Sequence, residues 1–409
     1  MILTHSGVLS MIDVLILIIL LYANVRVMQY IINIQLSIRF LQTKKMARLG
    51  NMGLTILIPV YDEASIIGET VKYFEHLISS LQGIRVLFVT TAREGTSYAN
   101  KTYRAIKEAI SSPKISIYQS RAHGKAAQLN EAINRMKHVN NHYIAIFDAD
   151  SRPSVDGIRY VMRDPEPALV YQMFSSYCAD GQPLLARANA LFQTRWTLAY
   201  ELPTILKNYS AGKICLLAYC VGHGLIIEST YAKKNPFPTY SLTEDLAFGY
   251  RLSFANVLIK PVPYFDTCTV PYSLSDNIQQ SARWFAGELL LYKEYLASKN
   301  GGLWKTLHRY AILSQWILGP PVLFVVGFWA IRQPLLFTLL LLFLFNYVFV
   351  IHSLVARFQS RKQTLGTYLS LGLKSVLNCA GPWYAVFRLL LDRLGISIYS
   401  FFKTPRAGS

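Results

Sequence analysis

The amino-acid sequence predicts an α/β protein, built on a doubly wound and mostly parallel sheet and flanked by transmembrane helices at both ends of the chain. Two observations indicate this fold class. Hydrophobic residues make up 52% of the 409 residues and charged residues 16%, which is too apolar for an ordinary soluble protein and too polar for a pure membrane bundle. Short apolar segments alternate with helical patterns between residue 54 and about residue 271, and longer apolar segments lie outside that region.

The N-terminal segment is expected to cross a membrane. Residues 11–27 are almost all apolar, and a more polar helical pattern continues toward Ile38; about 20 mostly apolar residues are enough to span a bilayer. A cleaved signal peptide would carry basic residues before the apolar stretch, whereas the first ten residues contain no Lys or Arg. The basic residues follow the stretch instead: Arg26, Arg39, Lys44, Lys45 and Arg48. The positive-inside rule then places the next region in the cytoplasm.

The middle of the chain has the pattern of strands that alternate with helices. Four short apolar segments are predicted to be strands: residues 54–59, 85–90, 115–119 and 143–147. Three segments between them are predicted to be helices: residues 64–80, 97–111 and 125–136. Ligands of such sheets bind at the carboxyl ends of the strands, so we expect the functional residues there.

Two aromatic and basic helical segments, residues 183–208 and 277–296, fit either the membrane interface or packing within the α/β region. Residues 310–331 and 334–355 are apolar and long enough to span. Residues 365–391 are less clear, because Lys374 lies near the middle. A lysine at the bilayer centre costs roughly 2.5–3.5 kcal/mol on insertion scales.

Gly381-Pro382 is expected to break this last segment, so a broken or re-entrant helix pair and a third C-terminal span both stay open. Lys403 and Arg406 favour a cytoplasmic C-terminus. We therefore expect four regions: an anchor (1–40), a cytoplasmic α/β domain (41–271), an interfacial helix (272–304) and a C-terminal membrane region (305–409).

Charge and cysteine content narrow the classes of partner. The formal net charge is +18, which suits nucleic acid, an anionic membrane surface or anionic substrates. The basic residues lie beside apolar segments and form no dense run among aromatics, which favours the membrane and argues against nucleic acid. The five cysteines form no CxxC pair, so neither a disulfide framework nor a zinc site is indicated.

Carboxylates follow two of the predicted strands. Tyr61, Asp62 and Glu63 end the first strand, where they are candidates for the nucleotide edge or simply for a favourable helix start. Asp148 and Asp150 end the fourth strand. Two carboxylates one residue apart need neutralisation, and a hard cation such as Mg²⁺ or Mn²⁺ that bridges a diphosphate would provide it. Solvated loop aspartates are the alternative.

Three further motifs each have a structural alternative. Lys125 opens a helix after Gly124, which suits phosphate or a simple surface cap. Thr243-Glu244-Asp245 precedes an apolar helix, so Asp245 is a candidate general base and Thr243 a candidate cap. Gln280, Arg283 and Trp284 offer a phosphate fork and a flat face for a sugar ring, or an interfacial anchor.

The order of these motifs, a strand end, GKAxxLN, DxD, TED and QxxRW between two membrane regions, resembles glycosyltransferase family 2. It is most similar to the membrane-integrated branch with cellulose, hyaluronan and poly-N-acetylglucosamine synthases and ceramide glucosyltransferase. The resemblance covers residues 54 to about 293. It implies a GT-A fold, inversion at the anomeric carbon and a nucleotide-sugar donor, with UDP as the default.

The resemblance also implies residue roles. Asp148 and Asp150 would face the diphosphate and its metal, Asp245 would be the base, and Lys125 would lie near the nucleotide. Arg283 and Trp284 would hold the diphosphate or the acceptor sugar. Residues 219–224 resemble the acceptor-side loop of these enzymes. Gly222 and His223 are therefore candidate contacts of the acceptor. The chain departs from the family after the second strand, where Thr90 and Thr91 stand in place of an aspartate pair.

Together these features predict a membrane-bound, inverting, metal-dependent glycosyltransferase that extends a polysaccharide of the cell envelope, a capsule or an exopolysaccharide. Its expected location is a bacterial inner membrane, with the catalytic domain in the cytoplasm. A single sugar addition to a membrane lipid is the first alternative, and a catalytically inactive scaffold subunit is the second. A partner subunit for export stays open.

Overall fold

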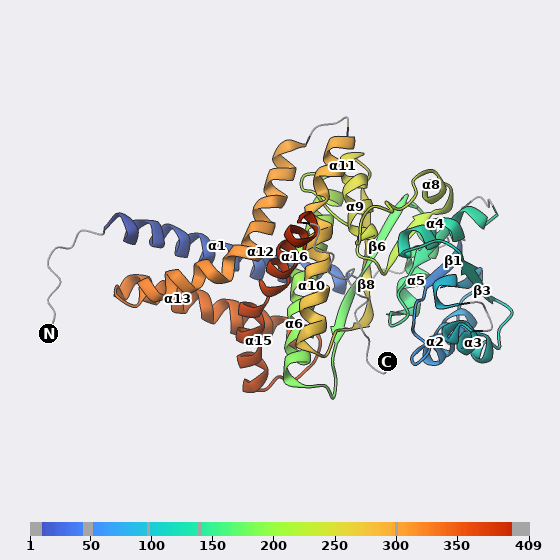
Figure 1. The fold of residues 1–409 in the computed structure, drawn as a ribbon, viewed down its shortest axis with the longest axis horizontal. Helices are drawn as coiled ribbons and strands as arrows, with labels where there is room; N and C mark the ends of the chain where they lie inside the picture. The colour runs from blue at the N-terminus through green and yellow to red at the C-terminus, as the bar shows by residue number, and fades with distance from the viewer. Residues whose placement is uncertain (1–9, 44–51, 96–98, 138–140, 299–301, 395–409) are drawn as a thin grey trace.

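The computed structural model describes residues 10–43, 52–95, 99–137, 141–298 and 302–394. The sheet and its covering helices form one end of an elongated molecule, and apolar helices project from the other (Figure 1). Five basic residues on which the predicted orientation rests lie outside the described residues: Lys44, Lys45, Arg48, Lys403 and Arg406.

An eight-stranded sheet has the order β3-β2-β1-β4-β7-β6-β8-β5. Its strands are β1 Gly53–Pro59, β2 Ile84–Thr91, β3 Ile115–Ser120, β4 His142–Ile146, β5 Arg152–Pro153, β6 Val170–Cys178, β7 Leu225–Glu228 and β8 Ile259–Thr269. The first four pair in parallel, as predicted. β7 runs antiparallel to both β4 and β6, and β5 antiparallel to β8, while β6 and β8 are parallel. The sheet is therefore mixed but mostly parallel.

Helices cover both faces of the sheet. They are α2 Ile67–Ser79, α3 Lys101–Ala109, α4 Lys125–Arg135, α5 Val155–Met162, α8 Ser229–Lys234 and α9 Glu244–Phe254, with a 3-10 turn η1 at Ala92–Glu94. In α2, Ile67, Val71, Phe74 and Ile78 recur every three or four residues and are all buried. This spacing places them on one face of a helix, where they join the strand residues of one core cluster.

The segment predicted as one amphipathic helix over 183–208 is interrupted by a π-helical turn. It consists of α6 Leu184–Trp196, the turn η2 Thr197–Glu201 and α7 Leu202–Ser210. Almost every residue of the second half of α6 is buried. The second predicted segment contains α10 Leu274–Leu289 and α11 Leu291–Ala297. Because its second half is buried, α6 packs within the protein over that half.

Within the described residues, three helical segments are long and apolar enough to cross a membrane: Met11–Gln42, Leu303–Ala330 and Pro334–Phe358. They are α1, α12 and the run of α13 Pro334–Phe345, the π-helical turn η3 Asn346–Val350 and α14 Ile351–Phe358. α1 lies beside α13 (Figure 1). Long-range hydrogen bonds connect α1 to its neighbours. Among them, Trp329 Nε1 donates to Asp13 Oδ1 at 2.9 Å, and Asn24 Nδ2 donates to the Leu339 carbonyl at 3.1 Å.

The last apolar segment is a broken pair, α15 Leu365–Leu377 and α16 Ala380–Arg393. The predicted position of the break was wrong: it falls at Asn378, and Gly381 and Pro382 lie in the first turn of α16, where a proline is tolerated. Gly381 is needed for packing instead, because a Cβ there would lie 2.4 Å from Cβ of Ser281 on α10. With 13 and 14 residues, the two helices are individually too short to span a bilayer.

Candidate active site

The Lys125 ammonium group joins three sequence motifs at one point. Its Nζ lies 3.0 Å from Asp148 Oδ1 and 3.3 Å from Glu244 Oε1, and it donates to the Gly222 carbonyl at 3.3 Å. Burial opposes the charge on Lys125, but the nearby carboxylates outweigh this and raise its pKa above the usual value. The helix starts of α4 and α9 and the carboxyl end of β4 thus converge, and Lys125 is no surface cap.

Asp245 is a partly buried carboxylate of this group, next to the buried Glu244. Burial and the neighbouring charge of Glu244 raise the pKa of Asp245 to about 7, which is where a general base works best at neutral pH. The side chain of Thr243 makes no capping hydrogen bond to a described backbone amide, so the capping interpretation of this motif is not supported. Glu244 and Asp245 occupy the first turn of α9, where the helix dipole favours negative charge.

Gly222 lies close to the carboxylate of Asp245. A Cβ at this position would lie 2.8 Å from Asp245 Oδ2, closer than real Cβ atoms approach, and 3.2 Å from Lys125 Nζ, which is a tight contact. The loop backbone can therefore lie against Asp245 only because residue 222 has no side chain.

Asp150 lies next to β8, where Thr269 Oγ1 donates to its Oδ2 at 2.8 Å. Asp148 and Asp150 both line one cavity with Glu244 and Asp245. These four carboxylates are hard oxygen donors, and such a donor set fits a divalent cation such as Mg²⁺ or Mn²⁺. The residues present are thus compatible with the predicted metal.

The loop after β1 is organised by Glu94, which follows β2. Glu94 Oε1 accepts from the Asp62 amide at 2.8 Å, and its Oε2 accepts from Thr102 Oγ1 at 2.6 Å. Tyr61 and Glu63 line the same cavity as the carboxylates. Asp62 is not among the described residues that line this cavity. Of the three candidates at the end of the first strand, Tyr61 and Glu63 therefore reach the site and Asp62 does not.

The QxxRW residues reach the cavity from α10. Gln280, Arg283 and Trp284 all line it, and Gln280 Oε1 accepts from Gln193 Nε2 of α6 at 3.2 Å. The side chains on this face of α10 therefore meet the same space as Asp245, which favours a role in binding over a lipid-facing anchor.

His223 belongs to a buried polar cluster in the wall of the cavity, which His223 and Cys268 both line. Its Nδ1 lies 2.7 Å from Ser175 Oγ and 3.3 Å from Asp266 Oδ2, with Cys268 Sγ at 3.8 Å. Burial opposes protonation of the ring, yet Cys268 and Asp266 raise the pKa of His223 well above its usual value. His223, Asp266 and Cys268 have metal-ligand spacing, but Ser175 hydrogen-bonds both His223 and Asp266, so the cluster is satisfied internally.

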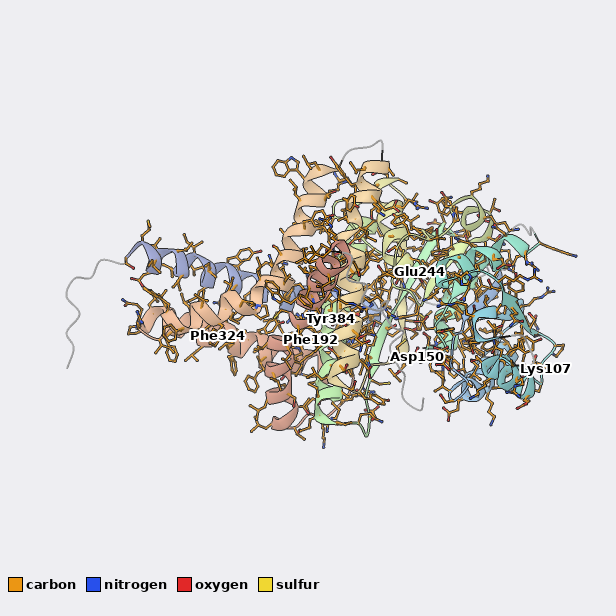
Figure 2. All side chains as sticks on the ribbon, viewed as in Figure 1. Lys107, Asp150, Phe192, Glu244, Phe324 and Tyr384 are labelled. Atoms are coloured by element: carbon orange, nitrogen blue, oxygen red, sulfur yellow. The ribbon has the colours of Figure 1, made fainter. Side chains whose placement is uncertain are left out.

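The cavity has a volume of about 1150 Å³ and continues from the carboxylates to the apolar helices α1, α12 and α13. Along the long axis in Figure 2, Asp150 and Glu244 lie toward the sheet, Phe192 lies in the middle, and Phe324 lies among the apolar helices. One continuous cavity therefore connects the carboxylates with the apolar helices.

Sequence reasoning missed the charged residues in the middle of this cavity. Arg309 of α12 forms a buried ion pair with Glu288 of α10, and Arg195 of α6 is buried among aromatic rings. The available signal was a basic residue inside an otherwise apolar or aromatic helix, because such residues face the protein interior or a cavity.

One solved structure in the comparison with known proteins has a TM-score above 0.5 and agrees with this fold, and two others match more weakly. A mannosyltransferase, PcManGT from Pyrobaculum calidifontis solved with GDP-Man and Mn²⁺, is similar over 91% of this chain and 98% of its own, with 15% identity and a TM-score of 0.51. TarS from S. aureus matches over 82% and 92%, with 11% identity and a TM-score of 0.37. The glucosyl-3-phosphoglycerate synthase of M. tuberculosis matches over 57% and 75%, with 14% identity and a TM-score of 0.34. A search of curated proteins finds no match.

Two family models match the sequence itself. The model described as Glycosyl transferase family 2 matches residues 55–170, a stretch that holds Lys125, Asp148 and Asp150. The model described as Glycosyl transferase family group 2 matches residues 143–360, more than half of the chain. This match extends through Asp245 and Arg283 into the apolar helices, and the chain belongs to glycosyltransferase family 2.

Proposed function

We propose that this protein is an inverting, metal-dependent glycosyltransferase that moves a sugar from a nucleotide sugar to an acceptor held at a membrane. One observation carries the proposal: Asp148, Glu244 and Asp245 lie around Lys125, and Asp150 lines the same cavity, which continues between the apolar helices. We keep the division into an anchor (1–40), a catalytic domain (41–271), an interfacial helix (272–304) and a membrane region (305–409), with the catalytic domain in the cytoplasm, as part of this proposal.

The donor diphosphate would lie beside Asp148 and Asp150, which would hold Mg²⁺ or Mn²⁺. Bound there, the cation supplies Lewis-acid stabilisation of the leaving diphosphate. Arg283 donates charge-assisted hydrogen bonds to the same phosphates. UDP remains the default nucleotide from the family resemblance, and Thr90 and Thr91 replace the expected aspartates near the nucleoside.

Asp245 would take the proton of the attacking acceptor hydroxyl. The bond between the anomeric carbon and the diphosphate oxygen breaks as the new glycosidic bond forms on the opposite face, which inverts the anomeric carbon. Lys125 keeps its charge between Asp148 and Glu244, so it holds the two motifs in register. Trp284 offers the flat face on which the acceptor or donor sugar ring can stack.

A polysaccharide and a membrane lipid are the two candidate acceptors. The QxxRW residues favour extension of a polymer, as the family resemblance implies. The continuation of the cavity among apolar side chains of α1, α12 and α13 favours a lipid, because hydrocarbon chains gain more from burial there than the hydroxyl-rich surface of a polysaccharide does.

The test is nucleoside-diphosphate release by the detergent-purified chain, with a panel of UDP- and GDP-sugars, Mg²⁺ or Mn²⁺, and a native lipid extract. We expect release from one donor, loss of release with EDTA, and loss in Asp245→Asn. Asp156→Asn is the matched control, since its carboxylate is largely exposed on α5. The anomeric configuration of the product, read by NMR, tests inversion.

No release from any donor by a folded sample in lipid would overturn the proposal in favour of the inactive scaffold. Release that persists in Asp245→Asn would mean that another group acts as the base.

A further inference from the structure

Arg195 is a buried cation without a described counter-ion. Its side chain is 3% exposed, and it lines the cavity. Its guanidinium carbon lies 4.3 Å from the ring centre of Phe192, 5.4 Å from that of Tyr347 and 5.9 Å from that of Trp196. Among the residues that the structure describes, no carboxylate is within ion-pairing distance, and Arg195 Nε has no hydrogen-bond partner. Burying a charge in this way is costly unless an anion joins it.

Lys374 of α15 is a second cation on the same ring. It is 4% exposed, lines the cavity, and its Nζ lies 5.2 Å from the centre of Phe192. Its described hydrogen-bond partner is neutral, the side-chain oxygen of Asn277. Arg195 and Lys374 come from helices nearly 180 residues apart, yet both face one ring and one cavity, so two positive charges are concentrated there without a described carboxylate.

Arg309 shows that this cavity can supply a counter-ion where one is needed. It is as deeply buried as Arg195, and Glu288 pairs with it through two hydrogen bonds. The lack of such a partner at Arg195 is therefore a local property of the pocket formed by Arg195, Lys374 and Phe192, which we call the anion pocket.

The anion pocket lies between the reacting carboxylates and the apolar part of the cavity, as the position of Phe192 in Figure 2 shows. Trp196, next to Arg195, donates from Nε1 to the Tyr219 hydroxyl at 2.7 Å. Tyr219 begins the loop that places Gly222 against Asp245. A short chain of contacts thus connects the pocket to the proposed base.

On the other side of the pocket the wall is apolar. It includes Ile19 of α1, Leu323 and Phe324 of α12, and Phe337, Leu341 and Leu344 of α13. A free inorganic anion would use only the pocket and leave this space unfilled, whereas an anionic lipid would use both.

We propose that the acceptor is an anionic membrane lipid, whose charged phosphate binds between Arg195 and Lys374 and whose hydrocarbon chains lie between α1, α12 and α13. This rests on the proposed sugar transfer and names its acceptor class. With the phosphate held there, a hydroxyl beyond it extends toward Asp245, and the apolar chains need not leave the membrane region. The donor diphosphate binds separately, beside Asp148 and Asp150.

Lipid binding can be measured without sugar transfer. The full chain in detergent is titrated with dioleoylphosphatidylglycerol, and binding is read by thermal shift and native mass spectrometry. The comparison probes are dioleoylphosphatidylcholine, which has the same chains without net charge, inorganic phosphate, and UDP. We expect saturable stabilisation by phosphatidylglycerol alone, with no competition from UDP. Stabilisation by inorganic phosphate of equal size would overturn the lipid assignment, as would equal stabilisation by phosphatidylcholine.

Arg195→Met and Lys374→Met are the test variants, because methionine preserves much of the buried volume. Each should weaken phosphatidylglycerol binding about tenfold or more, as expected for a charge-assisted contact. Lys207→Gln, an exposed lysine on the neighbouring α7, is the control and should bind within about twofold of the parent. Arg195→Met should also raise the melting temperature of the lipid-free protein, because it removes an uncompensated buried charge.

A lower melting temperature in lipid-free Arg195→Met, with lipid binding unchanged, would show that the arginine is structural and would overturn the proposal. If Arg195→Met does not fold, Lys374→Met decides the same question. With the donor present, sugar must be transferred to the lipid that binds. If the lipid binds but receives no sugar, while the donor is still hydrolysed by water, the acceptor assignment is rejected and the proposed activity is retained. Lipid binding without any donor turnover would reject the proposed activity instead.

Discussion

At the sheet end of the cavity, the Lys125 ammonium group lies among the carboxylates of Asp148 and Glu244. In the middle of the cavity, Arg195 and Lys374 lie over the ring of Phe192, and no carboxylate in the described part of the chain comes within ion-pairing distance. The first region has an excess of negative charge and suits a divalent cation with a diphosphate. The second has an excess of positive charge and suits an anion. One cavity therefore has two regions of opposite charge. In the proposed function, each region binds a different substrate.

The largest expected effect is at the sheet end. Asp245→Asn should lower kcat by roughly 10²–10⁴-fold, as removal of a general base does, while the KM of the donor changes little. Rates of diphosphate release and sugar transfer measure it. The same variant should bind phosphatidylglycerol normally; if lipid binding were lost as well, the two regions would not be independent.

Stability should change in opposite directions when a charge is removed at Arg309, which has a counter-ion, and at Arg195, which has none among the described residues. Glu288→Gln leaves Arg309 buried without its counter-ion, so the free energy of unfolding should fall by about 3–5 kcal/mol. Unfolding in detergent micelles measures it. Glu108→Gln, an exposed glutamate on α3, is the control and should change stability by no more than about 0.5 kcal/mol. If Glu288→Gln and Arg195→Met shifted stability in the same direction, the distinction between the two arginines would be wrong.

Gly222 tests how closely the acceptor loop must approach Asp245. In Gly222→Ala, the new Cβ would meet Asp245 Oδ2 at 2.8 Å, so the carboxylate or the loop must move. A displacement of about 1 Å at a reacting group can cost about 10²-fold in rate, and we expect a kcat loss of that order. Gly68→Ala is the matched control, because no described atom lies within 4 Å of its Cβ. Equal activity in both variants would contradict the close approach.

The smallest expected effect is on pH dependence. Since the pKa of Asp245 is about 7 in the folded chain, and the base acts in its ionised form, kcat/KM should rise as pH increases through about 7 and then level off. Lys125 favours the ionised carboxylate, so Lys125→Gln should move the midpoint of the pH–rate profile upward. An unchanged midpoint would separate Lys125 from the base.

The same raised pKa makes folding stability fall with increasing pH, whereas kcat/KM rises. A carboxyl whose pKa is raised on folding binds a proton more tightly in the folded chain, so its contribution to stability is largest below its unfolded pKa of about 4. That contribution falls as pH rises from about 4 to 7. Melting temperatures of Asp245→Asn should therefore depend less on pH over this interval than those of the parent chain.

The first half of the sheet and the motifs at its edge could be predicted from the sequence. β1 and β4 begin and end within one residue of the predicted strands, because an apolar run and its boundary are local properties of the chain. The convergence of Lys125 with Glu244 could be expected only through the family resemblance, since it depends on how β7 pairs with β4 across some 80 residues.

The sequence did not predict which charged residues in the middle of the cavity have a counter-ion. Arg195 and Arg309 have similar local surroundings in the sequence, both beside aromatic residues in a helix. What distinguishes them is that Glu288 reaches Arg309 and not Arg195, which is a consequence of how α10 packs. The position of the break before α16 was predicted wrongly for a related reason. Gly381 is required because α10 packs closely against it, and a sequence alone does not distinguish such a glycine from one that ends a helix.

The hydrogen bonds between α1 and the later helices have a consequence for biosynthesis. Asn24 and the Leu339 carbonyl are separated by 315 residues, and Asp13 and Trp329 by 316. At about 5–20 residues per second, translation needs roughly 15–60 s to deliver these partners. During that time Asp13 has its local partner Ser10, and the Asn24 amide has the Leu20 carbonyl one turn earlier. A ribosome that stalls before α12 therefore leaves behind a chain whose first helix is held through Asn33 and Ser37 to η2 but lacks its contacts with the later helices.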